Sequence, residues 1–422
     1  MISRRDFSLK AVGAGLGAAL AASPFGAAFA GDESPLNVLM EYKRQSEWSD
    51  RFDATIRDQT AVKSDQPTLS PETAAYIEQA IQKYAQISAR GGWPRVPGGS
   101  KLRIGARDRR VVTLRKRLMV TGDLEQSAGL SDTYDSYVAF AVRRFQLRHG
   151  FQPDGVVGNY TLAALNVPVA VRLHQLETNL IRVRSMSGFL GDRYVMVNIP
   201  AAEIEAVENG RVHSRHTAVV GKIDRQTPLL ASKIHELNFN PYWHVPESII
   251  RKDLIPKMNQ DPTYLADNKI RIYDQSGNEL TAEQINWHTD EAVNYRFRQD
   301  PGAINSMGSV KINFYNKHSV YLHDTPAKTL FGTDRRFHSS GCVRVQNVRE
   351  LIGWLLETTP DWDRARVDEV IRSGERIDVR IKHPVPIYTT YITAWATADG
   401  IVNFRDDVYN RDGAGNLAQN QN

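Results

Sequence analysis

The hydrophobic pattern of this chain changes its period near Tyr194, and this change limits the folds open to it. Before Tyr194, apolar residues recur every three or four positions, as at Leu173, Leu176, Leu180 and Val183. This spacing predicts a helix. After it, alternation of side chains predicts strands at 194–199, 217–220, 237–240 and 310–314. Helices followed by strands indicate an α+β protein whose C-terminal half is a β-rich mixed sandwich.

Two short motifs in the β-rich half carry reactive side chains. They are Tyr321-Leu322-His323-Asp324-Thr325-Pro326 and Ser339-Ser340-Gly341-Cys342-Val343-Arg344-Val345. Cys342 is the only cysteine of the chain, so it cannot form an intramolecular disulfide. A thiolate is a strong nucleophile, and a nearby imidazole can take the thiol proton. Glycine at 341 permits a sharp turn, after which the amides of Gly341 and Cys342 could face an oxyanion. The alternative is a small buried hydrophobe.

Three histidines could serve as the base for this thiol. His323 ends a short run of strand-forming residues and precedes an Asp-Thr-Pro turn. A strand end that leads into a turn is a place where a rigid scaffold presents a side chain to a cleft. His338 lies four positions before Cys342, and His318 is a third candidate. The residue pattern favours His323 and leaves the other two open.

The paired motifs resemble the catalytic signature of the peptidoglycan L,D-transpeptidases. More narrowly, they are similar to a large periplasmic subfamily with a capping segment. Further matches are Asn240-Pro241-Tyr242-Trp243-His244-Val245-Pro246, Arg298-Gln299-Asp300-Pro301-Gly302 and Thr393-Ala394-Trp395. The resemblance covers most of the chain after its first ninety or so residues. The wider family often has His where Ser340 stands, and the large subfamily accepts Ser there, which favours His323 as the base.

The resemblance implies a two-step acyl transfer between peptidoglycan stem peptides. Cys342 would attack the carbonyl of the third residue of a donor stem, and His323 would carry the proton. The backbone carbonyl of Asp324 is expected to orient His323, although the Asp324 side chain could cap its own turn instead. Arg344 is expected to clamp a substrate carboxylate, with a structural salt bridge as the alternative. The expected cleft-wall residues are Ser340, Tyr321 and Trp243, with core packing as the alternative for the last two.

Composition sets the outer limits on function. A length of 422 residues suits two or three domains. The net charge of +5 and the absence of a basic stripe with interleaved aromatics argue against nucleic acid as a partner. Neither a metal-ligand cluster nor a nucleotide loop stands out, so no cofactor and no metal are expected.

Residues 1–30 are expected to be a twin-arginine signal peptide. Ser3-Arg4-Arg5-Asp6-Phe7 precedes a short apolar stretch, and Ala28-Phe29-Ala30 offers a cleavage site. An uncleaved membrane anchor is the alternative. No cysteine lies at the cleavage site, which excludes lipoprotein processing. We therefore expect a periplasmic protein with no membrane span in its mature form.

The remaining chain divides into four predicted parts. Residues 31–100 form a helical scaffold, marked by Ser70 and Pro71 at a helix start. Residues 101–168 resemble a small three-helix peptidoglycan-binding module, which could bind glycan strands or only pack on its neighbour. Residues 169–410 form the catalytic domain, and 246–306 within it form a helical cap that could exclude water from an acyl-enzyme. The polar tail is 411–422.

Three other functions stay open at this stage. An L,D-carboxypeptidase or endopeptidase would use the same thiol with water as the acceptor. A papain-like protease would need its cysteine upstream of its histidine, and here the order is reversed. A non-catalytic wall-binding protein would not need the cysteine and histidine at all.

Overall fold

The computed structural model describes residues 64–413 of the chain. The predicted signal peptide, the first part of the predicted scaffold and most of the predicted tail therefore lie outside the described residues. The described part combines helices with a large sheet, as expected for an α+β protein. Within residues 64–413, no helix has both the length and the apolar character that crossing a bilayer requires.

The central sheet has nine strands in the order β11-β3-β12-β10-β9-β4-β13-β1-β2. Parallel and antiparallel pairs are mixed in it, and β3 pairs with β2 as well, so the sheet closes on itself around a core. The strands are β1 (Arg193–Asn198), β2 (Glu203–Glu208), β3 (Arg211–Gly221), β4 (Leu230–Phe239), β9 (Val310–Phe314), β10 (Leu322–His323), β11 (Phe337–Ser339), β12 (Val343–Val345) and β13 (Ile377–Thr390). β13 is one long strand with an irregularity between Arg380 and Val385.

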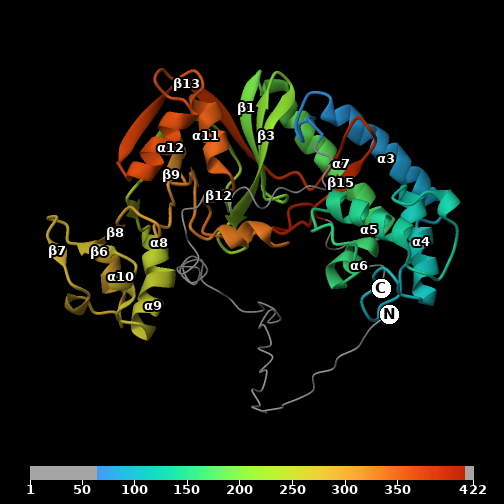
Figure 1. Cartoon of the computed structure of the whole chain (residues 1–422), viewed down its shortest axis with the longest axis horizontal. Coiled ribbons are helices and arrows are strands. Elements are labelled where there is room, and N and C mark those ends of the chain that lie inside the picture. Colours follow the sequence, from blue (N-terminus) through green and yellow to red (C-terminus); the bar gives the residue numbers. More distant parts are fainter. Residues whose placement is uncertain (1–63, 414–422) are drawn as a thin grey trace, which may run out of the picture. The chain divides into compact units, whose positions relative to one another are not determined.

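Two helices fill the inner side of this sheet. They are α11 (Val348–Leu356) and α12 (Arg364–Ser373), which lie together beside β13 in Figure 1. Asp363 caps α12 by accepting a hydrogen bond from the Arg366 amide, and Gly374 ends it in a left-handed conformation. The apolar faces of both helices share one core with alternate residues of the strands.

A second core lies on the outer side of β1. Val195 and Val197 point to the inner core, whereas Tyr194 and Met196 point outward. Burial on both faces explains why β1 is almost entirely apolar. The outward residues pack with α3 (Thr73–Ala89), α7 (Val169–Met186), and the strand pair β14 (Ala394–Ala396) and β15 (Val402–Phe404).

The helical module contains α4 (Arg109–Thr121), α5 (Ser136–Arg148) and α6 (Asn159–Leu165) around its own core. Asp108 and Asp135 cap the first two helices through their side chains. Tyr137 of α5 is 67% exposed, because the buried stripe runs through Val138, Ala141, Val142 and Phe145.

The cap, which was expected to be helical, contains strands as well as helices. It begins with α8 (Glu247–Ile249), a π-helical turn (Ile250–Leu254) and α9 (Ile255–Gln260), followed by α10 (Tyr264–Asp267). A four-stranded sheet of order β5-β8-β6-β7 completes it: β5 (Trp243–His244), β8 (Arg296–Gln299), β6 (Ile270–Tyr273) and β7 (Glu279–Leu280). These short strands carry no clear alternation, so the sequence pattern did not predict them. The domain limits at 100, 168 and 410 stay a prediction.

Candidate active site

Strand register brings the two reactive motifs together. β10 and β12 are parallel neighbours, with Leu322 opposite Val343 and His323 opposite Arg344. Leu322 and Val343 lie in the inner core. Because side chains alternate along a strand, His323 and Arg344 lie on the outer face. β9 pairs on the other side of β10 and places Lys311 opposite His323, so an imidazole lies between two cationic side chains.

The thiol of Cys342 lies one step before β12 and next to Tyr321. The backbone and the hydroxyl of Tyr321 lie close enough to the thiol to act on its pKa. Burial raises the pKa of the Cys342 thiol, although Tyr321 and the charges of Lys311 and Arg344 act in the opposite direction. The thiol is therefore protonated at neutral pH in this structure.

A hydrogen-bonded turn holds the segment before the thiol. Gly341 has a φ of +112°, a value that favours glycine, and its carbonyl accepts from Thr227 Oγ1 at 2.9 Å. The Gly341 amide donates to Ser339 Oγ at 3.1 Å. This contact argues against the expected oxyanion role of the Gly341 amide, because its hydrogen is already engaged. Of the two amides expected to face an oxyanion, the amide of Cys342 remains as the candidate.

His323 is buried and held by a backbone contact. Its Nδ1 lies 2.5 Å from the carbonyl oxygen of Asp324. A carbonyl only accepts, so Nδ1 carries the hydrogen and Nε2 keeps its lone pair. Burial lowers the pKa of His323 to about 3, and the charge of Arg344 adds to this effect. The imidazole is therefore neutral at neutral pH.

The Asp324 carboxylate does not contact His323 through any hydrogen bond found in residues 64–413, but it fixes the turn behind it. It accepts from Ser309 N at 2.8 Å, Ser309 Oγ at 2.7 Å and Lys328 Nζ at 2.6 Å. Burial alone would raise the pKa of Asp324, yet the charge and hydrogen bonds of Lys328 hold it below its usual value. Gly308 has a φ of +60°, and a Cβ there would lie 2.5 Å from Asp324 Oδ2. The sequence pattern did not predict the contacts of Ser309, Lys328 and Gly308 with Asp324, because only the fold brings these residues together.

Only 2% of the Arg344 surface is exposed, and its Nε and Nη1 have no hydrogen-bond partner within residues 64–413. The structural salt bridge considered as an alternative is absent from the described residues. Burial lowers the pKa of Arg344 to about 10, so it keeps its charge at neutral pH. A buried cation without a partner is costly, which makes this side chain ready to receive an anion.

Ser340, in the segment before Cys342, is linked to the cap through a neighbouring arginine. Its hydroxyl accepts from Arg225 Nη1 at 3.0 Å, and Arg225 is ion-paired with Asp253 in the π-helical turn. Arg225 follows β3, and Asp253 belongs to the cap. The Arg225 guanidinium therefore connects Asp253 of the cap to Ser340, which lies two residues before Cys342. No pattern in the sequence pointed to Arg225.

Tyr321 and Trp243 border the thiol from the cap side. Trp243 is buried in the core of the cap, and Tyr321 packs against that same core. Lys311 Nζ lies 4.5 Å from the centre of the Tyr321 ring. Trp243 thus has the packing role that was considered beside the cleft-wall role.

The two rival bases lie on other elements than β10. His338 is on β11, which pairs with β3 rather than with β10, and its Nε2 lies 2.9 Å from the carbonyl oxygen of Arg335. His318 is exposed on a turn before β10. Across residues 64–413, no group of three or more His, Cys, Asp or Glu side chains could hold a metal ion.

Comparison with known proteins agrees with this arrangement. Residues 192–392 match a family model described as "L,D-transpeptidase catalytic domain", and residues 107–165 match one described as "Putative peptidoglycan binding domain". A curated protein from Haemophilus influenzae named "Putative L,D-transpeptidase" is 34% identical over 246 residues. The match covers 58% of this chain and 49% of the relative, so the chain spans about half the length of that protein.

Solved structures give weaker similarities. An L,D-transpeptidase from Xylanimonas cellulosilytica is 17% identical, with 70% of this chain and 99% of that chain covered and a TM-score of 0.22. One from Stackebrandtia nassauensis is 13% identical, with 70% and 96% covered and a TM-score of 0.25. We base the assignment on the two family models. The chain is thus similar to L,D-transpeptidase catalytic domains over residues 192–392 and to peptidoglycan-binding domains over residues 107–165.

Proposed function

We propose that this protein cross-links peptidoglycan by cysteine acyl transfer between stem peptides. The observation that carries this proposal is the strand pairing that sets a neutral His323, oriented by the Asp324 carbonyl, beside the strand that follows Cys342. A neutral base with a free Nε2, on the strand paired with the one that follows a lone thiol, suits nucleophilic catalysis.

The first step transfers one proton and one acyl group. Thiol and imidazole are both neutral at rest, so the thiol proton moves to His323 Nε2 as Sγ attacks the donor carbonyl. The amide C–N bond then breaks, and the imidazolium returns the proton to the leaving amine of the terminal residue. A thioester on Cys342 remains. Attack by an acceptor amine, with His323 again as the base, releases the cross-linked product and the free thiol.

Arg344 supplies substrate binding in this proposal. Its unpartnered Nε and Nη1 suit a carboxylate of the donor stem. The bound anion would also offset the positive charge beside His323. This would raise the basicity of the imidazole when substrate is present, because the Arg344 charge contributes to its low pKa.

The hydrolytic alternative shares the same thioester. An L,D-carboxypeptidase or endopeptidase would pass the acyl group to water instead of to an amine. An isotope-labelled acceptor stem distinguishes the two, because transpeptidation incorporates the label into product and hydrolysis does not. The wider assignment includes export to the periplasm through the twin-arginine signal, and contact of the helical module with glycan strands.

Intact-mass spectrometry with a carbapenem as acyl donor tests the proposal. We expect a stable adduct on wild type, none on Cys342→Ala, and a rate at least about a hundredfold lower in His323→Ala, the usual scale of general-base catalysis. His338→Ala is the matched control and should react as wild type does. A folded wild type with a titratable thiol and no adduct would favour a non-catalytic wall-binding role. A slow His338→Ala beside a normal His323→Ala would reassign the base.

A further inference from the structure

Lys311 is a cation of the candidate active site that takes no part in the proton transfer from Cys342 to His323. It belongs to β9, where it pairs with His323 of β10. Its neighbour Ile312 points into the inner core, so the Lys311 side chain lies on the outer face, as His323 does. Lys311 is half-buried, and no ion pair found within residues 64–413 includes it. Partial burial of an ammonium costs solvation energy, which indicates a role beyond solubility.

Tyr321 connects Lys311 to the thiol. The Lys311 Nζ lies 4.5 Å from the centre of the Tyr321 ring, a distance typical of a cation–π contact. The carbonyl of the same tyrosine accepts a hydrogen bond from the amide of Val343 at 3.1 Å, which fixes Tyr321 beside the residue that follows Cys342. The Tyr321 ring also meets the His323 ring edge-on, with ring centres 5.7 Å apart. The tyrosine therefore holds the ammonium near the reacting groups.

The two cations that flank His323 act mainly on different groups. Burial raises the pKa of the Cys342 thiol, and among the charges that oppose this effect Lys311 acts more strongly than Arg344. Burial lowers the pKa of His323, and there Arg344 contributes more than Lys311. The charge of Lys311 is thus directed mainly at the sulfur, and the charge of Arg344 mainly at the imidazole.

A negative charge on the sulfur and the proton of Lys311 stabilise each other. Burial lowers the pKa of Lys311, and a thiolate at Cys342 is the strongest of the charges that oppose this effect. The other two are the carboxylates of Glu236 on β4 and Asp378 on β13. The ammonium therefore gains its main electrostatic partner only when the sulfur becomes negative.

Acyl transfer at this thiol needs a cation, because few donors face the charge that the reaction creates. The Gly341 amide already donates to Ser339, which leaves the Cys342 amide as the candidate for the oxyanion. The thiol is protonated and the pKa of His323 is about 3, so proton transfer between them separates charge in a buried place. A fixed ammonium makes this separation less unfavourable on the side of the sulfur.

We propose that the Lys311 ammonium stabilises the negative charge that forms on Sγ of Cys342, an inference that rests on the function proposed above. The proton still moves from Sγ to His323 Nε2 as the carbon–sulfur bond forms, and Lys311 keeps its own proton throughout. When the acceptor amine attacks the thioester, the carbon–sulfur bond breaks and Lys311 stabilises the departing sulfur again. Lys311 and Arg344 thus have separate tasks, since Arg344 binds the carboxylate of the donor.

The pH dependence of Cys342 alkylation tests this inference, because only the thiolate reacts. Iodoacetamide is the probe, since it is small and uncharged and does not depend on recognition of a substrate. Lys311→Met removes the charge and keeps the length of the side chain, whereas Lys311→Arg keeps the charge. The rate of carbapenem acylation is measured on the same full-length variants, and thermal unfolding checks that each is folded.

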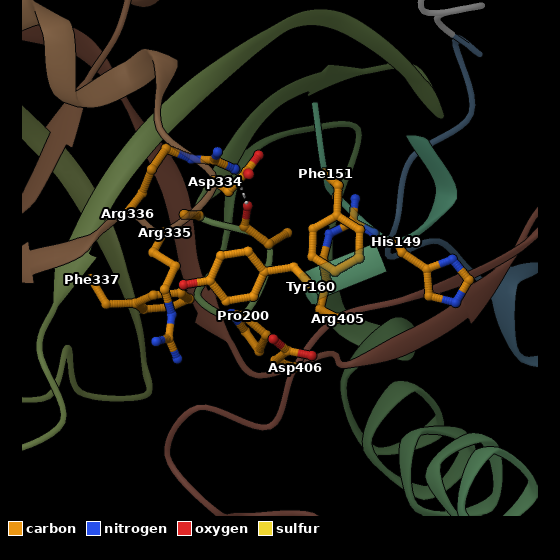
Figure 2. Close-up of a pocket in the computed structure, with 13 residues that line it drawn as sticks. His149, Phe151, Tyr160, Pro200, Asp334, Arg335, Arg336, Phe337, Arg405 and Asp406 are labelled. Carbon is orange, nitrogen blue, oxygen red and sulfur yellow. Dashed lines mark hydrogen bonds between the residues drawn. The ribbon is translucent and has the colours of Figure 1, made fainter. Parts of the chain in front are cut away.

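Two matched controls remove a cation elsewhere. Lys317→Met changes an exposed lysine on the turn between β9 and β10. Arg335→Met changes an exposed arginine seven residues before Cys342. Figure 2 shows Arg335 in a pocket that is lined by Tyr160 and Phe337 and by none of the reacting groups. Both controls should be alkylated and acylated as wild type is.

We expect Lys311→Met to raise the pH midpoint of alkylation by about one unit, so that below this midpoint it reacts about tenfold more slowly than wild type. Carbapenem acylation should also be at least about tenfold slower. Lys311→Arg should bring both rates back to within about threefold of wild type, because it restores the charge.

An unchanged midpoint in folded Lys311→Met would overturn the inference, even with slow acylation, because Lys311 would then act on the donor and not on the sulfur. A midpoint raised equally in Lys311→Arg would also refute it, since packing and not charge would be responsible. If wild type forms the carbapenem adduct while the midpoint of Lys311→Met is unchanged, the inference fails alone. If the midpoint depends on Lys311 but wild type forms no adduct, the proposed function fails and the effect of Lys311 on the sulfur stands.

Discussion

Replacing Asp324 by asparagine separates the role of its side chain from that of its backbone carbonyl. The carbonyl contacts His323, and the carboxylate contacts Ser309 and Lys328. Asp324→Asn keeps the backbone and the volume of the side chain, but removes its charge. We expect a less stable protein that still forms the acyl-enzyme.

The expected loss follows from three hydrogen bonds. An asparagine oxygen can still accept from Ser309, but its NH₂ group would face the Lys328 amine, where two donors meet. One charged hydrogen bond is lost, at about 2 kcal/mol, and the two bonds from Ser309 weaken by about 0.5 kcal/mol each. The sum is about 3 kcal/mol. The Lys328 amine is partly exposed and regains water, which keeps the loss below that of a fully buried broken pair.

The contribution of Asp324 to the stability of the protein depends on pH in a defined direction. The folded pKa of Asp324 lies below its unfolded value, so its stabilising contribution is complete above about pH 4 and is lost as the pH falls through the folded pKa. The stability difference between wild type and Asp324→Asn should therefore be constant from pH 6 to 8 and should shrink in acid.

Urea unfolding measures the stability, and the carbapenem mass assay measures the acylation rate. Glu369→Gln, which breaks the exposed pair with Arg366, is the control and should cost less than about 1 kcal/mol. The acylation rate of folded Asp324→Asn should stay within about tenfold of wild type. A variant as stable as Glu369→Gln, or one as inactive as His323→Ala while folded, would refute the reasoning.

Three further predictions concern the same site. Gly308→Ala should destabilise the protein by more than about 1 kcal/mol, because its Cβ would collide with the Asp324 carboxylate in a left-handed backbone, and urea unfolding measures this. Arg225→Gln should slow acylation by a large donor more than by a small carbapenem, because it loses the ion pair with Asp253 in the cap; equal slowing for both donors would contradict a role through the cap. The acylation rate should not decline between pH 7.5 and 5, because the pKa of His323 is about 3, and an acid limb near pH 6.5 would show an ordinary histidine.

Local sequence patterns predicted much of this protein, because they depend on neighbours in the chain. The alternation at 310–314 corresponds to β9, and the helical spacing from Leu173 to Val183 lies within α7. The resemblance of the two motifs to the L,D-transpeptidases is confirmed at the level of the family by the match to residues 192–392. The roles of Cys342 and His323 stay predictions. The sequence pattern did not predict the four-stranded sheet of the cap, because strands of two to four residues are too short to show a hydrophobic period.

Only the tertiary structure decided which charges surround the reactive groups. The row of Lys311, His323 and Arg344 exists because β9, β10 and β12 pair in one register, and a shift of one residue would turn every side chain to the other face. The supports of Asp324 and the contact from Arg225 to the cap likewise join residues far apart in sequence. The sequence thus determined the chemistry available to the protein. The pairing of strands determined that the His323 imidazole is neutral, that the Cys342 thiol is protonated, and that Nε and Nη1 of Arg344 have no hydrogen-bond partner among the described residues.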